Sequence, residues 1–157
     1  YRVTRADGVA RVICYDPRHN VTLAEMPVAK IADVVRMWQA QYRELGARPE
    51  VNHVLIFENK GEAVGVSNPH PHGQIYATNY VFKTIENEAR TCARHHAATG
   101  RSLLADILAA EVADGRRVLA ENDAAIGFVP YFARYAYETF VAPRRVVPSV
   151  AELTDGE

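Results

Sequence analysis

Two prolines constrain the backbone of one short segment, residues 68–75, which reads NPHPHGQI. Proline has a fixed φ and no amide hydrogen, so residues 69 and 71 favour an extended backbone at a sheet edge or at the entrance of a strand. Alternate side chains of an extended segment share one face, and we therefore expect His70, His72 and Gln74 to point the same way. Taken alone, such a pair of histidines also fits surface side chains beside a proline-rich turn.

Segments of strand and helix character alternate along the rest of the chain. Apolar side chains recur at three- and four-residue spacing over residues 28–45, which predicts an amphipathic helix that ends near Gly46. Helical composition marks residues 84–98 and 102–113, with Ser102 as the N-cap of the second helix. Runs rich in β-branched and aromatic residues predict strands at residues 9–15, 51–58, 72–82, 117–122, 125–130 and 137–143. No repeat or linker divides these elements, so we expect one α+β domain over residues 1–157, with helices packed on an antiparallel sheet.

The two cysteines and a cluster of aromatic residues are expected to be structural. Cys14 and Cys92 lack the paired spacing of a zinc or redox motif, which predicts buried free thiols. Aromatic residues in strands usually fill a core rather than stack on bases, and we expect the same of the cluster Phe128, Tyr131, Phe132, Tyr135, Tyr137 and Phe140.

The charge balance and the hydropathy exclude two classes of partner. Eighteen Lys and Arg against nineteen Asp and Glu leave a formal charge of −1, so no broad cationic surface is available for a nucleic-acid polymer. No apolar run approaches the roughly 20 residues of a membrane helix, and the sequence shows no signal peptide. We expect a cytoplasmic protein that binds neither nucleic-acid polymers nor membranes.

The histidine segment belongs to a longer pattern. Residues 57–61 read FENKG, and residues 67–77 read SNPHPHGQIYA after a short gap. This pattern closely resembles the galactose-1-phosphate uridylyltransferases, a branch of the histidine-triad superfamily. The likeness includes residues 11–19 and 22–23 upstream and residues 113–115, 129–131 and 138–139 downstream, so it covers nearly the whole chain. It implies a histidine-triad-like fold, and it implies that these residues are most of the N-terminal half of a longer chain.

The resemblance implies a covalent mechanism in galactose metabolism. The superfamily signature has three alternating histidines, and the transferase branch replaces the third by glutamine, here Gln74, which favours transfer over hydrolysis. By the family pattern His72 is the nucleophile that takes UMP from UDP-glucose and passes it to galactose 1-phosphate. A neutral imidazole is a competent nucleophile near pH 7, and a backbone carbonyl that accepts from its other nitrogen would fix the reactive tautomer. Gln74 resembles the side chain that donates to a phosphoryl oxygen.

The resemblance also assigns binding residues and partners. It places UDP-hexose on Asn59, Gly65, Val66, Ser67 and Gln74, and it leaves Glu58 and Lys60 as solvated or supporting charges. A glycine-containing turn lets backbone amides approach phosphate oxygens. The family further implies a homodimer without an organic cofactor.

Two metal sites are implied by the same resemblance. In members with a structural zinc, the ligands are histidines at the positions of His19 and His70 and a Cys-x-x-Cys pair that would precede Tyr1. Two histidines alone cannot close a tetrahedral site. Glu88 matches a glutamate that binds a second metal, iron or zinc, in some members.

Three other functions remain open at this point. A related sugar-nucleotide phosphorylase would share the HPHGQ segment, whereas Gln74 argues against a histidine-triad nucleotide hydrolase. The third alternative is a nucleotide-binding fragment that is inactive on its own.

Overall fold

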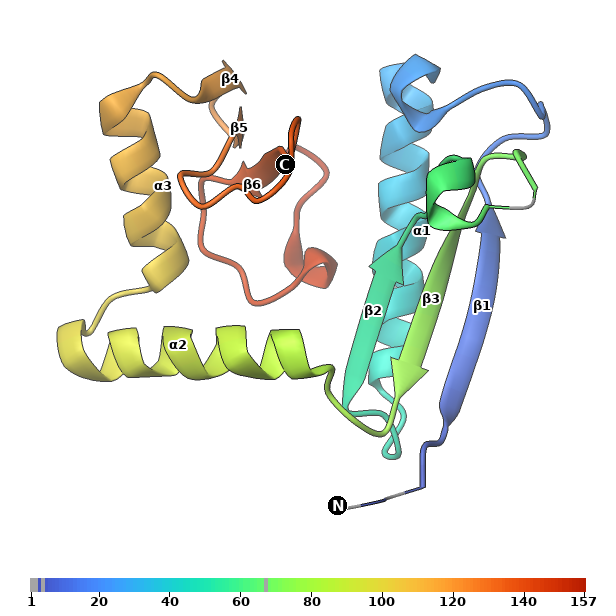
Figure 1. Ribbon diagram of the computed structural model, residues 1–157, viewed down its shortest axis with the longest axis horizontal. Helices are drawn as coiled ribbons and strands as arrows, with labels where there is room; N and C mark the ends of the chain where they lie inside the picture. The colour runs from blue at the N-terminus through green and yellow to red at the C-terminus, as the bar shows by residue number, and fades with distance from the viewer. Residues whose placement is uncertain (1–2, 4, 67) are drawn as a thin grey trace. The chain divides into compact units, whose positions relative to one another are not determined.

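The structure is a computed structural model that describes residue 3, residues 5–66 and residues 68–157 (Figure 1). The chain forms two compact units, Tyr1–Phe82 and Lys83–Glu157. Both units combine helices with strands, and every strand pairing among the described residues is antiparallel, which confirms the α+β prediction. The single domain over residues 1–157 stays a prediction.

The first unit is built around a three-stranded sheet. Its elements are β1 (Gly8–Cys14), η1 (Leu23–Glu25), α1 (Val28–Gly46), β2 (His53–Phe57), η2 (Glu62–Val64) and β3 (His72–Thr78). The strand order is β1-β3-β2, so β3 is the central strand. Pro71 directly precedes β3, and its carbonyl accepts the backbone N–H of Tyr15 at 3.0 Å. The prolines therefore lie at the entrance of a central strand rather than along an edge.

Helix α1 packs against one face of this sheet, as the predicted amphipathic pattern requires (Figure 1). The core on that face is formed by Leu45, Val54, Ile75 and Ala77. A second cluster, beyond the end of β1, contains Val21, Met26 and Val34, with Tyr15 and Trp38 packed against it. Burial alternates along β3 because successive side chains point to opposite faces, so His72, Gln74 and Tyr76 are left on the other face.

The second unit combines two helices with a smaller sheet. Its elements are α2 (Lys83–Thr99), α3 (Leu103–Asp114), β4 (Val118–Glu121), β5 (Ala125–Phe128), β6 (Phe140–Pro143) and η3 (Val150–Glu152). The sheet order is β4-β5-β6. The predicted N-cap is confirmed, because Ser102 Oγ accepts from the backbone N–H of Ala105 at 3.4 Å. None of the helices in the described part of the chain combines the length and the apolar composition of a membrane span.

The last predicted strand begins later than expected. Tyr137 has a φ of +64°, a left-handed conformation that a strand does not accommodate. The turn is held by Glu138, whose Oε2 accepts the backbone N–H groups of Arg134 and Tyr135 at 2.8 and 3.2 Å. The strand therefore starts at Phe140, after this turn.

Two burial predictions are wrong. Cys14 is exposed, because it lies on edge strand β1 with its side chain on the face away from α1. Cys92 on α2 is half-buried. Of the aromatic cluster only Phe128 is buried, while Tyr131 and Tyr137 are 83% and 97% exposed. Both tyrosines lie in the connection between β5 and β6 rather than in a strand, so they have no inward-facing position.

Candidate active site

The two residues expected to carry the chemistry lie on one face of β3. His72 pairs with Cys14 of β1 in the register, and Gln74 pairs with Val12 of β1 and with Phe57 of β2. Both side chains are half-buried. Gln74 thus lies between two paired strands, whereas His72, at the start of β3, is paired with β1 alone.

The ring of His72 is oriented by its own chain. Its Nδ1 lies 2.7 Å from the carbonyl oxygen of His70. A carbonyl can only accept, so Nδ1 carries the hydrogen and Nε2 keeps a free lone pair in the neutral ring. This is the carbonyl contact that the sequence argument required for a reactive tautomer.

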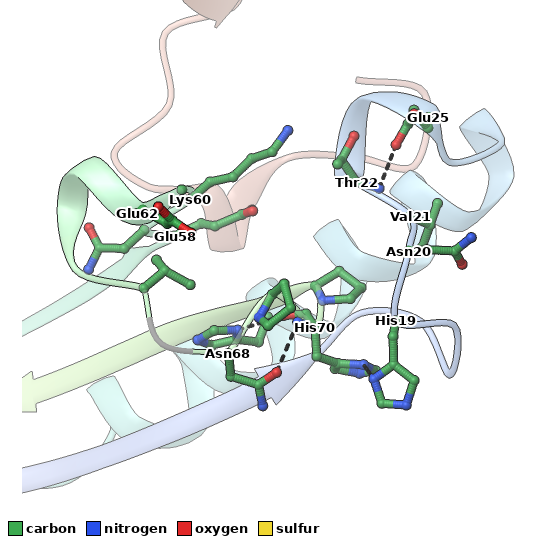
Figure 2. Close-up of a pocket in the computed structure, with 16 residues that line it drawn as sticks. His19, Asn20, Val21, Thr22, Glu25, Glu58, Lys60, Glu62, Asn68 and His70 are labelled. Atoms are coloured by element: carbon green, nitrogen blue, oxygen red, sulfur yellow. Dashed lines mark hydrogen bonds between the residues drawn. The ribbon is translucent and has the colours of Figure 1, made fainter.

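Asn68 shapes the turn that presents this carbonyl. Its Oδ1 accepts the backbone N–H of His70 at 3.0 Å, and Figure 2 shows the side chain curled under that residue. Such a contact is an Asx turn, which Asn-Pro dipeptides favour. The turn places the His70 carbonyl next to the ring of His72. Sequence reasoning gave Asn68 no role, although the Asn-Pro pair was the signal that could have indicated one.

A small cavity of about 170 Å³ brings most of the expected substrate-binding residues together with His72 and Gln74. Asn59, which follows β2, and Gly65 and Val66, which follow η2, line it. Gly61 and Gly65 bracket η2 with φ values of +94° and +79°, a region that favours glycine and lets the chain turn back sharply towards β3.

The amides of this turn are engaged within the turn itself. The N–H of Gly65 donates to Glu62 O at 2.9 Å, and the N–H of Val66 donates to Gly61 O at 3.4 Å. The expectation that these two amides approach a phosphate therefore requires the turn to open. Ser67, the remaining expected contact, lies outside the described residues.

A larger cavity of about 570 Å³ adjoins the small one and shares Asn59, Val66, Asn68 and His72 with it (Figure 2). Glu58 and Lys60 line it as well, so these two charges border the space next to His72. Burial raises the pKa of the Glu58 carboxyl, and the nearby Lys60 and His72 partly oppose that rise.

His19 and His70 meet at the same cavity, although 51 residues separate them. Their Nδ1 atoms are 2.9 Å apart, and Figure 2 shows the two rings side by side. The turn before His19 is fixed by Asp16, whose carboxylate accepts both the backbone N–H and the guanidinium of Arg18. These contacts lower the pKa of Asp16 to about 2.

The expected metal ligands form one pair and one separate residue. No group of three or more His, Cys, Asp or Glu side chains suited to a metal occurs among the described residues. Glu88 is exposed on α2, in the second unit. The structure thus brings His19 and His70 together, and two histidines alone cannot close a tetrahedral metal site.

The sequence matches the family model of the galactose-1-phosphate uridyl transferase N-terminal domain over residues 1–81. The chain belongs to the galactose-1-phosphate uridyl transferase family. The matched range includes every expected site residue except Glu88. It therefore contains the whole His70-to-Gln74 arrangement described above.

Similar proteins extend the likeness to nearly all of the given residues. The galactose-1-phosphate uridylyltransferase of Haemophilus influenzae is 39% identical over 155 residues, with 99% of this chain and 44% of the relative covered. That of Rattus norvegicus is 37% identical over 157 residues, covering 100% of this chain and 41% of the relative. A solved uridylyltransferase structure aligns with a TM-score of 0.90 at 28% identity, over 96% of this chain and 48% of the other. The chain spans less than half the length of these relatives.

Proposed function

We propose that the full-length protein is a UDP-glucose–hexose-1-phosphate uridylyltransferase that exchanges UMP between UDP-glucose and galactose 1-phosphate through a uridylyl-His72 intermediate. Family membership and the names of the curated relatives support this substrate class. The observation that carries the proposal is the 2.7 Å contact from His72 Nδ1 to the His70 carbonyl, which leaves Nε2 free beside Gln74 and the cavities.

In the first half-reaction, Nε2 of His72 attacks the α-phosphorus of UDP-glucose. The N–P bond forms as the bond from that phosphorus to the bridging oxygen breaks, and glucose 1-phosphate leaves with the electron pair. The ring becomes positively charged because Nδ1 keeps its hydrogen, and the His70 carbonyl dipole stabilises that charge. In the second half-reaction, a phosphate oxygen of galactose 1-phosphate attacks, the N–P bond breaks, and the electron pair returns to Nε2.

Gln74 acts on the group that is transferred. Its carboxamide N–H is proposed to donate to a non-bridging oxygen of the α-phosphoryl group, where negative charge builds up in the transition state. The amide is uncharged and supplies no proton to the leaving group, so it stabilises transfer without promoting hydrolysis. Asn59, Gly65, Val66 and Ser67 are proposed to bind the UDP-hexose around it.

We further propose that His19 and His70 are two ligands of a structural zinc. The two Nδ1 atoms share a hydrogen bond in this structure, and two imidazoles that carry their hydrogens on Nε2 can instead turn both Nδ1 lone pairs to one cation. The metal would fix His70 and so steady the carbonyl that orients His72. Metal content of the full-length protein with and without His19→Ala tests this, with zinc expected only in the wild type. A second metal at Glu88, a homodimer, a cytoplasmic location and the lack of an organic cofactor stay predictions.

The test uses the full-length protein and UDP-glucose labelled in the uridylyl phosphate. We expect one equivalent of glucose 1-phosphate to be released in a burst and the label to appear on His72. His72→Ala is expected to abolish labelling, while His96→Ala, which changes an exposed histidine on α2, is the matched control and is expected to label normally.

Other outcomes assign other functions. Continuous release of UMP from UDP-glucose alone would indicate a histidine-triad hydrolase. Transfer of the nucleotidyl group to inorganic phosphate rather than to a hexose phosphate would indicate a phosphorylase. Binding without any release would indicate a protein that only binds nucleotide, and labelling that survives His72→Ala would exclude His72 as the nucleophile.

A further inference from the structure

The carboxamide of Gln74 presents two chemically opposite ends. Its NH₂ group donates hydrogen bonds and its Oε1 only accepts them. Only the NH₂ end can stabilise a phosphoryl oxygen, because Oε1 in the same place would repel it. The proposed role of Gln74 therefore depends on which end faces the cavity, and something must hold the amide in that orientation.

Tyr76 contacts the accepting end of this amide. Its hydroxyl faces Gln74 Oε1 as a donor at 3.5 Å, a weak contact that is longer than the usual O–H···O distance of about 2.5–3.0 Å. Residues two apart on a strand share a face, so Tyr76 lies on the face that carries His72 and Gln74. With Oε1 turned to the hydroxyl, both hydrogens of the NH₂ group stay available. A hydrogen bond accepted at the oxygen also polarises the amide and strengthens its donor end.

The ring of Tyr76 is anchored by a neighbour on β2. Phe57 packs edge-on against it, with ring centroids 5.0 Å apart and an interplanar angle of 74°. Phe57 is also the register partner of Gln74, so the three side chains form one group across β2 and β3. Such aromatic pairs contribute energy beyond their buried area, which limits the positions that the hydroxyl can take.

We propose that Tyr76 is a positioning residue that fixes the carboxamide of Gln74 with its NH₂ end toward the transferred phosphoryl group, while Phe57 holds the Tyr76 ring. This inference rests on the proposed uridylyl transfer. On this proposal, loss of the Tyr76 hydroxyl lowers the turnover rate and leaves the binding of UDP-glucose almost unaffected.

The kinetic test is a double-mutant cycle in the full-length protein. Tyr76→Phe keeps the ring against Phe57 and removes only the hydroxyl, so we expect kcat to fall about two- to tenfold with KM almost unchanged, as for one neutral hydrogen bond. In the Gln74→Ala background the same change is expected to have no further effect. Additive losses would overturn the proposal. Tyr80→Phe, another exposed tyrosine of the same unit, is the matched control and is expected to keep full kcat.

A second readout does not depend on activity. The side-chain amide resonance of Gln74, observed by NMR in the full-length protein, is expected to shift in Tyr76→Phe and to stay in place in Tyr80→Phe. An unchanged resonance in Tyr76→Phe would overturn the contact. If the wild type transfers no uridylyl group, the proposed function fails, and so does the proposal that the NH₂ group of Gln74 faces a transferred phosphoryl group. If transfer occurs and the losses are additive, only the role of Tyr76 fails.

Discussion

Gly73 lies between His72 and Gln74, on the face of β3 that packs toward α1, and it leaves no room for a side chain. A Cβ at this position would clash with the Tyr15 hydroxyl oxygen and would lie 2.8 Å from its Cζ. Tyr15 is not free to retreat, because its ring packs edge-on against Trp38 and its backbone N–H is bonded to Pro71. Gly73→Ala therefore forces either the ring or the strand to move.

The expected cost can be estimated from the two opposing effects. Overpacking a well-filled core costs about 1–3 kcal/mol. Alanine regains about 0.5–1 kcal/mol relative to glycine in a strand, because it has less backbone entropy to lose. We expect a net loss of about 1–2 kcal/mol in the free energy of unfolding. Since the displaced backbone also carries His72 and Gln74, turnover is expected to fall by about tenfold.

Urea denaturation monitored by circular dichroism measures this loss as a lower midpoint at unchanged slope. Gly127→Ala is the matched control, because Gly127 also lies in the central strand of a three-stranded sheet and its added Cβ would meet nothing closer than 3.7 Å. Tyr15→Phe is expected to restore part of the loss, since it removes the closest contact and leaves Cζ in place. Equal midpoints for Gly73→Ala and Gly127→Ala would refute the reasoning.

Two further predictions concern charged contacts outside the reaction. Glu111 is 2% exposed and accepts from Arg117 Nε at 2.7 Å and from the Tyr131 N–H at 2.8 Å, so Glu111→Ala is expected to cost about 3 kcal/mol in urea denaturation. A cost below about 1 kcal/mol would contradict this. The pKa of Asp16 is held at about 2, below its ordinary 3.8, so its stabilisation is present above about pH 4 and is lost as the pH falls toward 2. Arg18→Ala is expected to flatten stability against pH in that window, and an unchanged slope would contradict the pairing.

Much of the first unit could be predicted from the sequence because its patterns are local. The helix near residues 28–45 follows from apolar spacing, and the strand entrance at Pro71 follows from the missing amide hydrogen. The shared face of His72 and Gln74 follows from strand alternation alone. These features depend on neighbours within a few positions, so no knowledge of the fold is needed.

The remainder depends on residues that meet only after folding. The contact between His19 and His70 and the packing of Tyr15 on Gly73 join segments more than fifty positions apart. The exposure of Cys14 depends on which face of β1 the helix covers, and the covered face carries Arg11, the one charged residue of that strand. The carboxylate of Glu138 accepts the backbone N–H of Arg134 and so stabilises the turn there, a contact that strand propensity does not predict.

The alternation along β3 also determines how inherited variants of this strand would behave in cells. Gly73, Ile75 and Ala77 are buried, so changes at odd positions lower the amount of folded protein and reduce its abundance. Changes at His72 or Gln74 leave the packed face intact and yield normal amounts of a defective protein. Over residues 72–77 the parity of the position thus separates variants that a stabilising small molecule can rescue from variants that it cannot, whereas Thr78 is buried at an even position.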